Sequence, residues 1–278
     1  MSDNGQNAKR KLEGPSADRS SKRRKGGQKH RDPKAGGRVI IESGDSGVFV
    51  TCDMGKENKC IAEALDLFSS KVEITESSAE AETAPDEEEE DIEAQIKKEV
   101  EGLQPKSSAS RLFQPIKLDI PCMVFIRVDK SIDPVKLVHD LCAEAKAHPE
   151  KKQCRWVRRM TPVSLIRKTL SVELSEFAKT VLGPHFHSGG GSKKFAIRPT
   201  VTSNNKFSRD SIIKTVASVV GREHSVDLKN YDLLIIVLVI QNVIGMSVVG
   251  SDYDDLKRYN LAELYRPAPK ASAAPASE

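Results

Sequence analysis

Lys and Arg dominate residues 151–209, where 13 basic side chains stand against two acidic ones. Such side chains bind phosphate groups, because their N–H donors carry a positive charge. Apolar runs interleave with the charges, so the charges are predicted to lie on the surface of a folded domain. A folded basic surface is typical of a nucleic-acid-binding protein. The alternative is that these side chains only solvate the surface.

The candidate RNA-binding residues lie around predicted strands and turns. Asn204, Asn205 and Ser208 precede a predicted helix, whose free N–H groups favour a phosphate. Few aromatic residues accompany the basic side chains, among them Trp156, Phe186, Phe195 and Phe207, so recognition of a folded RNA by backbone and shape is favoured over base stacking. The candidates are Arg155, Arg158, Arg159, Arg167, Lys168, Lys193, Lys194, Arg198, Asn204, Asn205, Lys206 and Arg209.

Familiar catalytic motifs are missing from the chain. The triplet Gly189-Gly190-Gly191 lacks the spacing of a phosphate-cradling loop, and no G-x-G-x-x-G occurs. The zinc-deaminase signature and the Gly-rich turn of an acetyltransferase are also missing. His185 and His187 fit a surface turn without further metal ligands at suitable spacing, and Asp254-Asp255 fits an exposed loop. We predict no catalytic residue, no metal and no cofactor, while an unfamiliar active site stays open.

The cysteines and the length of the apolar runs argue against two further classes of protein, those held by zinc or disulfides and those that span a membrane. The five cysteines form no C-x-x-C pair, which argues against a zinc site or a disulfide framework and favours a reducing compartment. The longest apolar run, Leu233 to Ile240, is too short to span a bilayer and predicts a buried strand. We expect no membrane association.

Two folded domains are predicted. Residues 38–147 form a small α+β domain, in which Asp133-Pro134 starts the second helix. Residues 148–252 form an α/β domain. The expected elements of the first are a strand at 48–52, a helix at 56–70, a strand at 121–128 and a helix from 133. Those of the second are strands at 155–160, 194–201, 233–240 and 243–249, with helices at 171–182 and 208–220.

Three segments are predicted to be disordered, because they lack an apolar pattern that could bury a core. They are the basic tail 1–37, the acidic insert 73–110 and the part of the C-terminal tail 253–278 that follows its apolar-patterned piece 259–265. The segment Arg258 to Leu264 either packs back on the second domain or docks a partner. Two basic clusters in the first tail resemble a bipartite nuclear import signal, although a nonspecific RNA-contacting tail is the alternative. The signal residues are Arg10, Lys11, Lys22, Arg23, Arg24 and Lys25.

The second domain resembles a THUMP domain, an RNA-binding fold of tRNA-modification proteins. The likeness rests on Arg158-Arg159-Met160-Thr161-Pro162-Val163, Phe195-Ala196-Ile197, Asn204-Asn205 with Arg209-Asp210, Val226-Asp227-Leu228, and Gly245-Met246-Ser247-Val248-Val249. The residues before it are similar to the ferredoxin-like domain that precedes THUMP. Val50 to Glu57, the acidic insert and Arg258 to Leu264 resemble the stand-alone THUMP proteins that assist cytidine acetylation in eukaryotic tRNA.

This resemblance implies an α+β protein in which an N-terminal ferredoxin-like domain is followed by an α/β THUMP domain. It implies a tRNA-binding adaptor that docks on the acceptor end and works with an RNA cytidine acetyltransferase. That enzyme makes N4-acetylcytidine in the D-arm of serine and leucine tRNAs from acetyl-CoA and ATP, neither of which the adaptor uses. We expect a monomer on its own, in the nucleus and its nucleolus. The alternative is a nucleolar ribosome-biogenesis factor that binds structured RNA.

Overall fold

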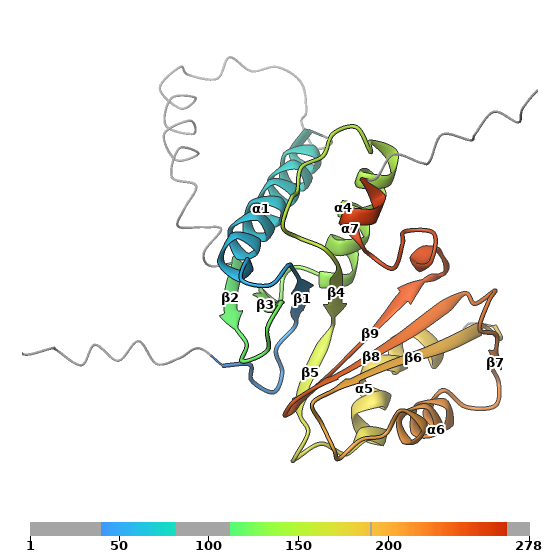
Figure 1. The fold of residues 1–278 in the computed structure, drawn as a ribbon. Coiled ribbons are helices and arrows are strands. Elements are labelled where there is room, and N and C mark those ends of the chain that lie inside the picture. The colour runs from blue at the N-terminus through green and yellow to red at the C-terminus, as the bar shows by residue number, and fades with distance from the viewer. Residues whose placement is uncertain (1–39, 82–111, 190, 266–278) are drawn as a thin grey trace, which may run out of the picture. The chain divides into compact units, whose positions relative to one another are not determined.

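The computed structural model describes residues 40–81, 112–189 and 191–265 (Figure 1). These residues belong to one compact unit that begins at Val39. The basic tail, its import signal and most of the acidic insert therefore lie outside the described residues. None of the helices within the described ranges is both long and apolar enough to cross a lipid bilayer.

A four-stranded antiparallel sheet forms the N-terminal half, in the order β2-β3-β1-β4. Its helices pack on one face, and the strand–helix–strand–strand–helix–strand succession confirms the ferredoxin-like fold. The Asp133 side chain accepts a bond from Val135 N and caps the second helix, as predicted. The elements are β1 Gly47–Thr51, α1 Glu57–Ala81, β2 Phe113–Lys117, β3 Met123–Val128, α4 Pro134–Ala147 and β4 Met160–Val163.

Strand β4 corrects the predicted assignment of residues 155–160 to the second domain. It spans 160–163 and pairs with β1, so it closes the first sheet. Pro162 fits there because β4 is an edge strand, whose residues need not all donate to a neighbour. The predicted division after residue 147 therefore does not fall between the two sheets.

Helix α1 is the second correction, because it continues to Ala81 instead of ending near Ser70. The first residues assigned to the disordered insert, 73–81, are thus helical. Their Glu and Ala residues have high helix propensity, which can extend a helix already anchored by a packed first half.

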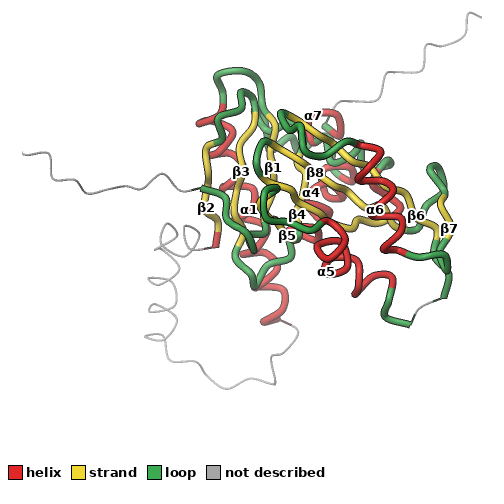
Figure 2. Tube along the Cα trace, turned by 90° about the horizontal axis from the view of Figure 1, so that it is seen from below, coloured by secondary structure: helices red, strands yellow, loops and turns green. Residues whose placement is uncertain are grey.

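A five-stranded mixed sheet forms the C-terminal half, in the order β5-β9-β8-β6-β7. Helices α5 and α6 lie side by side across one face (Figure 2). The short strands β5 and β7 were not predicted, and α5 continues past the expected stop at Gly183-Pro184. The elements are β5 Leu165–Lys168, α5 Leu174–Phe186, β6 Lys194–Thr202, α6 Arg209–Val220, β7 Ser225–Val226, β8 Leu233–Ile240 and β9 Val243–Gly250.

The two sheets meet through an apolar layer. Phe49, Ile116 and Phe125 of the first sheet join Leu238 and Val243 of the second in one buried cluster. Where β9 passes β4, a Cβ on Gly245 would lie 2.5 Å from Val163 Cγ1, so a larger residue at 245 would have to displace the Val163 side chain. The two sheets are thus fixed against one another by buried side chains.

Residues 251–265, named the strap here, return from β9 to the first domain. The strap contains the short 3-10 helix η1 Ser251–Tyr253 and the helix α7 Leu261–Leu264. Met160 N donates to Tyr259 O at 3.0 Å, and Arg159 and Asn260 form an isolated antiparallel β-bridge. The strap therefore pairs with the open edge of β4. Its apolar side chains complete the first core: Tyr253, Leu256, Tyr259, Leu261, Leu264 and Tyr265. The predicted C-terminal tail is therefore packed as far as residue 265.

Candidate RNA interface

Two arginines converge on one carboxylate where the strap leaves the second sheet, and a third lies nearby. Arg198 of β6 donates two bonds to Asp254, at 3.1 and 3.2 Å, and Arg258 Nε donates at 2.8 Å. The Tyr231 hydroxyl donates at 2.8 Å to the same group. Arg159 lies near enough to Tyr253 to influence its ionisation, and its side chain is exposed. We call Arg159, Arg198, Asp254 and Arg258 the junction cluster.

Hydrogen bonds and burial within the junction cluster shift the pKa values of Asp254, Arg198 and Tyr231. The Arg198 bonds, aided by those from Tyr231 and Arg258, hold the pKa of Asp254 well below its usual range. Burial, together with the Asp254 bond, raises the pKa of Tyr231 to about 12. Partial burial opposes charge on Arg198, but the contact with Asp254 outweighs it and raises the pKa of that guanidinium. The cluster contains three guanidinium groups and one carboxylate, so its formal net charge is positive.

An unusual backbone conformation places Arg258. Lys257, Arg258 and Tyr259 have φ values of 52°, 57° and 57°, a left-handed run without glycine. Each such residue costs roughly 1–2 kcal/mol. The fully buried Tyr259 ring, which packs edge-on against Tyr253 at 4.8 Å, holds the run in place. The turn brings the Arg258 guanidinium back onto Asp254, which positions it beside Arg198.

The remaining predicted residues do not form one patch. Arg158 makes a two-bond ion pair with Asp53, at 2.7 and 3.1 Å, and Arg155 lies over the Trp156 ring. Lys193 and Lys194 stand at the start of β6, whereas Asn204 follows its end, about 30 Å away at roughly 3.3 Å per residue. The predicted set therefore divides into groups at the first-sheet edge, the junction, and the two ends of β6.

Several of these side chains bind the chain itself. The Asn204 amide donates to Gln241 O at 2.6 Å and accepts from the N–H groups of Lys206 and Phe207. Lys206 Nζ donates to Thr169 O, and Lys193 Nζ donates to His185 O at 2.7 Å. Two further contacts are the Lys168 Nζ bond to Ile41 O and the Arg167 bond to Ile166 O at 3.4 Å. These bonds stabilise turns of the chain, so fewer N–H donors of these side chains remain for a ligand.

The start of α6 is open but already capped. Ser208 Oγ accepts from Ser211 N at 3.1 Å, and Asp210 adds a negative charge to the first turn. Both features reduce the attraction of this helix end for a phosphate. Asn205 and Arg209 are exposed beside it.

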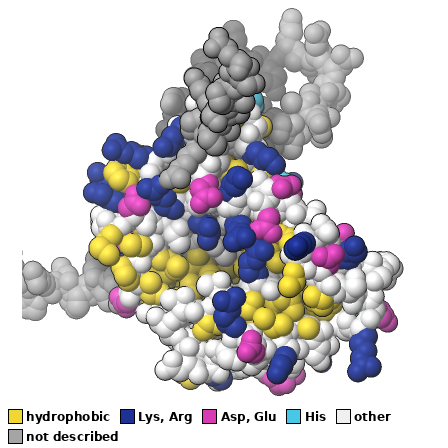
Figure 3. All heavy atoms as spheres, turned by 45° about the vertical axis from the view of Figure 1, so that its right-hand side comes forward, with side chains coloured by type: hydrophobic (Ala, Val, Ile, Leu, Met, Phe, Trp, Pro, Cys, Tyr) yellow, Lys and Arg dark blue, Asp and Glu magenta, His cyan; other side chains and the backbone are white. Residues whose placement is uncertain are grey.

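Figure 3 shows basic side chains in several groups on one face, with acidic side chains among them. Sequence reasoning missed Arg258, although the Arg258-Tyr259-Asn260 run stood out, because the segment was assigned to a tail. It also missed that Asp254 organises the cluster, since its partner Arg198 lies 56 residues earlier in the chain.

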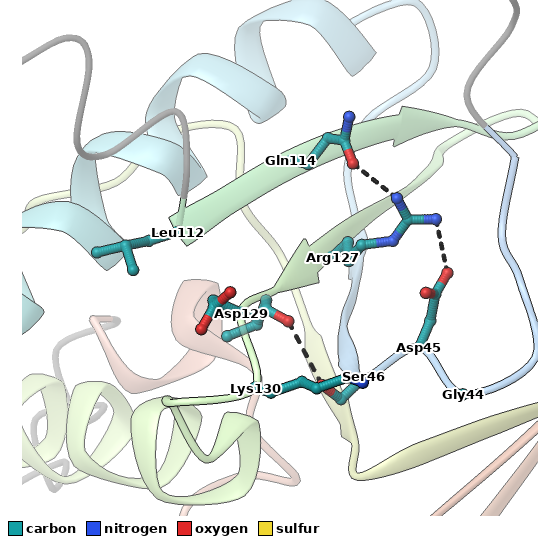
Figure 4. A pocket seen from close by; sticks show the side chains of 9 residues that line it. Gly44, Asp45, Ser46, Leu112, Gln114, Arg127, Asp129 and Lys130 are labelled. Atoms are coloured by element: carbon teal, nitrogen blue, oxygen red, sulfur yellow. Dashed lines mark hydrogen bonds and ion pairs between the residues drawn. The ribbon is translucent and has the colours of Figure 1, made fainter.

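Arg127 lies in a hollow of about 230 Å³ on the first sheet (Figure 4). Its guanidinium bonds Gln114 Oε1 and Asp45 Oδ2, both at 2.7 Å, and the Ile40 carbonyl. These bonds tie the segment before β1 to the sheet, and the hollow is smaller than a usual ligand pocket. Across the described ranges, His, Cys, Asp and Glu form no group that could hold a metal ion.

Comparison with known proteins gives one family match and several relatives. A THUMP domain model matches residues 171–249. A Schizosaccharomyces pombe protein named only as uncharacterized is 38% identical, with 82% of this chain and 79% of that protein aligned. The "tRNA acetyltransferase TAN1" of Saccharomyces cerevisiae is 32% identical over 81% and 86%. The human "THUMP domain-containing protein 1" is 31% identical over 84% and 67%.

Two solved structures are also similar. The solution structure of the THUMP domain of THUMP domain-containing protein 1 is 28% identical, covers 30% of this chain and 86% of its own, and has a TM-score of 0.26. The Pyrococcus horikoshii protein PH1313 is 12% identical and covers 74% of this chain and 55% of its own, with a TM-score of 0.39. Of the junction cluster, only Arg198 lies inside the matched THUMP residues.

Proposed function

The chain belongs to the family of THUMP domain-containing proteins, and on this premise we propose that it is a tRNA-binding adaptor for tRNA acetylation. The observation that carries the proposal is the likeness to the yeast protein named for tRNA acetylation, which extends over 86% of that protein. The likeness therefore includes the first sheet as well as the matched domain.

The geometry of the junction cluster supports a phosphate-binding role. Arg forms paired N–H bonds to phosphate oxygens, and an arginine already held in place loses less side-chain freedom on binding. Arg198 and Arg258 are held by Asp254, while Arg159 is free to reach outward. The cluster draws on both sheets, so an RNA bound there contacts both domains.

The proposed division of labour is that this chain holds tRNA while a separate RNA cytidine acetyltransferase makes N4-acetylcytidine. Holding the RNA and the enzyme together turns their encounter into a nearly intramolecular one, at an effective concentration of order mM. Serine and leucine tRNAs are the proposed substrates. The enzyme would bind the first domain or the acidic insert, because Leu261 and Leu264 of the strap are buried.

A second candidate is that the chain transfers the acetyl group itself, which the printed name of the yeast relative favours. Reconstitution separates the two. Purified chain, partner enzyme, tRNA, acetyl-CoA and ATP are combined and then omitted one at a time, and N4-acetylcytidine is measured. The adaptor predicts product only when both proteins are present. Product from this chain without a partner would establish the second candidate.

The RNA surface is tested by Arg159→Glu, with Lys179→Glu on α5 as the matched control of equal charge change. Lys179 is exposed on the opposite, helix-covered side of the second sheet. We expect Arg159→Glu to weaken tRNA binding about tenfold and to lower the slope of log K against log salt by roughly one. Equal effects of both variants, with unchanged circular dichroism, would remove the junction cluster from the interface.

A further inference from the structure

Three cations surround the sole tryptophan of the chain. Lys56 Nζ, Lys59 Nζ and the Arg155 guanidinium lie 5.4, 5.0 and 4.7 Å from the centre of the Trp156 ring. The indole is half-buried, and all of these residues lie outside the matched THUMP residues. We call these four residues the indole group.

A single carboxylate fixes the position of the indole. Glu63 of α1 accepts bonds from three successive backbone N–H groups, those of Arg155, Trp156 at 2.6 Å and Val157 at 2.8 Å. This carboxylate is therefore occupied by the backbone and is not placed to pair with the cations. The segment carrying Arg155 and Trp156 is held to α1 before any ligand arrives.

In the part of the chain that the structure describes, no carboxylate lies within ion-pair distance of the cations, although the Arg158 bond and, from further away, the charge of Lys56 lower the pKa of Asp53. No ion pair there involves Lys56, Lys59 or Arg155, whereas Arg158 nearby is paired with Asp53. A cation over an aromatic ring is attracted to the face of the ring, and it keeps its N–H donors for other acceptors. Three like charges held together in this way favour an anion that accepts from all of them.

We propose that the indole group binds a backbone phosphate of an RNA strand. The inference rests on the proposed function only in that the chain binds RNA. A groove of about 680 Å³ continues from Lys59 and Trp156 along α1. Glu63 and Asp66 line this groove and disfavour a second phosphate, so the groove takes the neutral ribose or base beside the bound phosphate, where the indole edge offers an aromatic contact.

An RNA strand fits better here than an acidic peptide. The indole group continues toward the junction cluster along residues 155–159, which span at most about 14 Å of extended chain. A polyanion with regularly spaced charges can contact both groups at once. A nucleobase of an RNA can also stack on the indole, whereas the carboxylate side chain of an acidic peptide cannot.

The tryptophan provides a direct reading of this site. Because Trp156 is the sole tryptophan, its emission reports on the indole group alone. Full-length chain is titrated with tRNA, with single-stranded polyuridylate and with a poly-glutamate peptide, while anisotropy of labelled tRNA follows binding in parallel. We expect tRNA to change the Trp156 emission with the same midpoint as the anisotropy. Binding of tRNA without an emission change overturns the inference.

The other two ligands separate this inference from the proposed function. If tRNA does not bind but polyuridylate changes the emission, the function fails and the phosphate site stands. If neither RNA changes the emission, or if only poly-glutamate does, the phosphate site is wrong.

Variants give a second measurement. Lys56→Gln with Lys59→Gln should lower the salt slope of tRNA binding by about one and reduce the emission change. Lys179→Gln with Lys214→Gln removes the same charge from exposed positions of α5 and α6 and should leave both unaltered. An equal fall in slope for both pairs would refute the site, because the effect would then follow net charge alone.

Discussion

Replacing Tyr259 by Phe should stabilise the protein, whereas replacing it by Ala should destabilise it strongly. The ring is fully buried and packs edge-on against Tyr253. Its hydroxyl is also buried and has no hydrogen-bond partner among the described residues. A buried polar group without a partner costs about 1–3 kcal/mol, which Tyr259→Phe removes while keeping the ring. Truncating a buried aromatic ring to Ala typically costs about 3–5 kcal/mol.

Thermal and urea unfolding followed by circular dichroism measure both variants. A change of 1 kcal/mol shifts the Tm of a domain this large by about 2–4 °C. We therefore expect Tyr259→Phe to raise the Tm by a few degrees and Tyr259→Ala to lower it by about 10 °C or more. A Tm lowered by Tyr259→Phe would show that the hydroxyl is bonded in solution. A Tm unchanged by Tyr259→Ala would refute the packing of the strap.

Gly245→Val should cost about 1–3 kcal/mol of unfolding free energy, because its Cβ meets Val163, and Val163→Ala should recover part of that loss; additive losses would contradict the close approach. Partial burial lowers the pKa of His139, but the 2.6 Å contact with Asp252 and the contact with Asp140 outweigh it, so the folded-state pKa is raised. This contribution is fully present below about pH 6.5, the unfolded pKa, and is lost as pH rises through the folded one. His139→Gln should remove that loss, which stays under about 1 kcal/mol because the pair is largely exposed. Identical pH profiles of Tm for the two proteins would refute the stabilising contact between His139 and Asp252. Deleting residues 86–105 should leave the Tm within a degree or two in calorimetry, since their composition offers no core; a large drop would mean that they pack.

Local signals in the sequence predicted the helices and long strands well. Ser208 caps α6 and Gly221 ends it with a φ of 92°, as the residue types indicated. The run Leu233 to Ile240 is the buried strand β8. Even so, Ile213 of α6 is 37% exposed although Ile212 beside it is fully buried, because an apolar pattern gives the face of a helix less sharply than its extent.

The pairing of distant elements could not be read from the same signals. A strand pattern at 155–160 does not say which sheet it joins, and β5 and β7 are too short for a pattern. The junction cluster depends on a left-handed turn at 257–259 that no glycine announces. Of the predicted RNA-binding residues, Asn204 illustrates the limit: its amide type suggested a ligand, yet tertiary contacts use it to hold a turn.

The return of the strap bears on how the chain folds during synthesis. The first sheet gains its last strand only at residue 163, and its core gains Tyr259 and Leu261 after the whole second sheet has emerged. Domains usually fold as units from the N-terminus while the ribosome is still working. Here the first half must wait with part of its apolar surface uncovered until the C-terminal residues arrive. Arg258 arrives with them, so a prematurely ended chain loses core packing and one arginine of the junction cluster together.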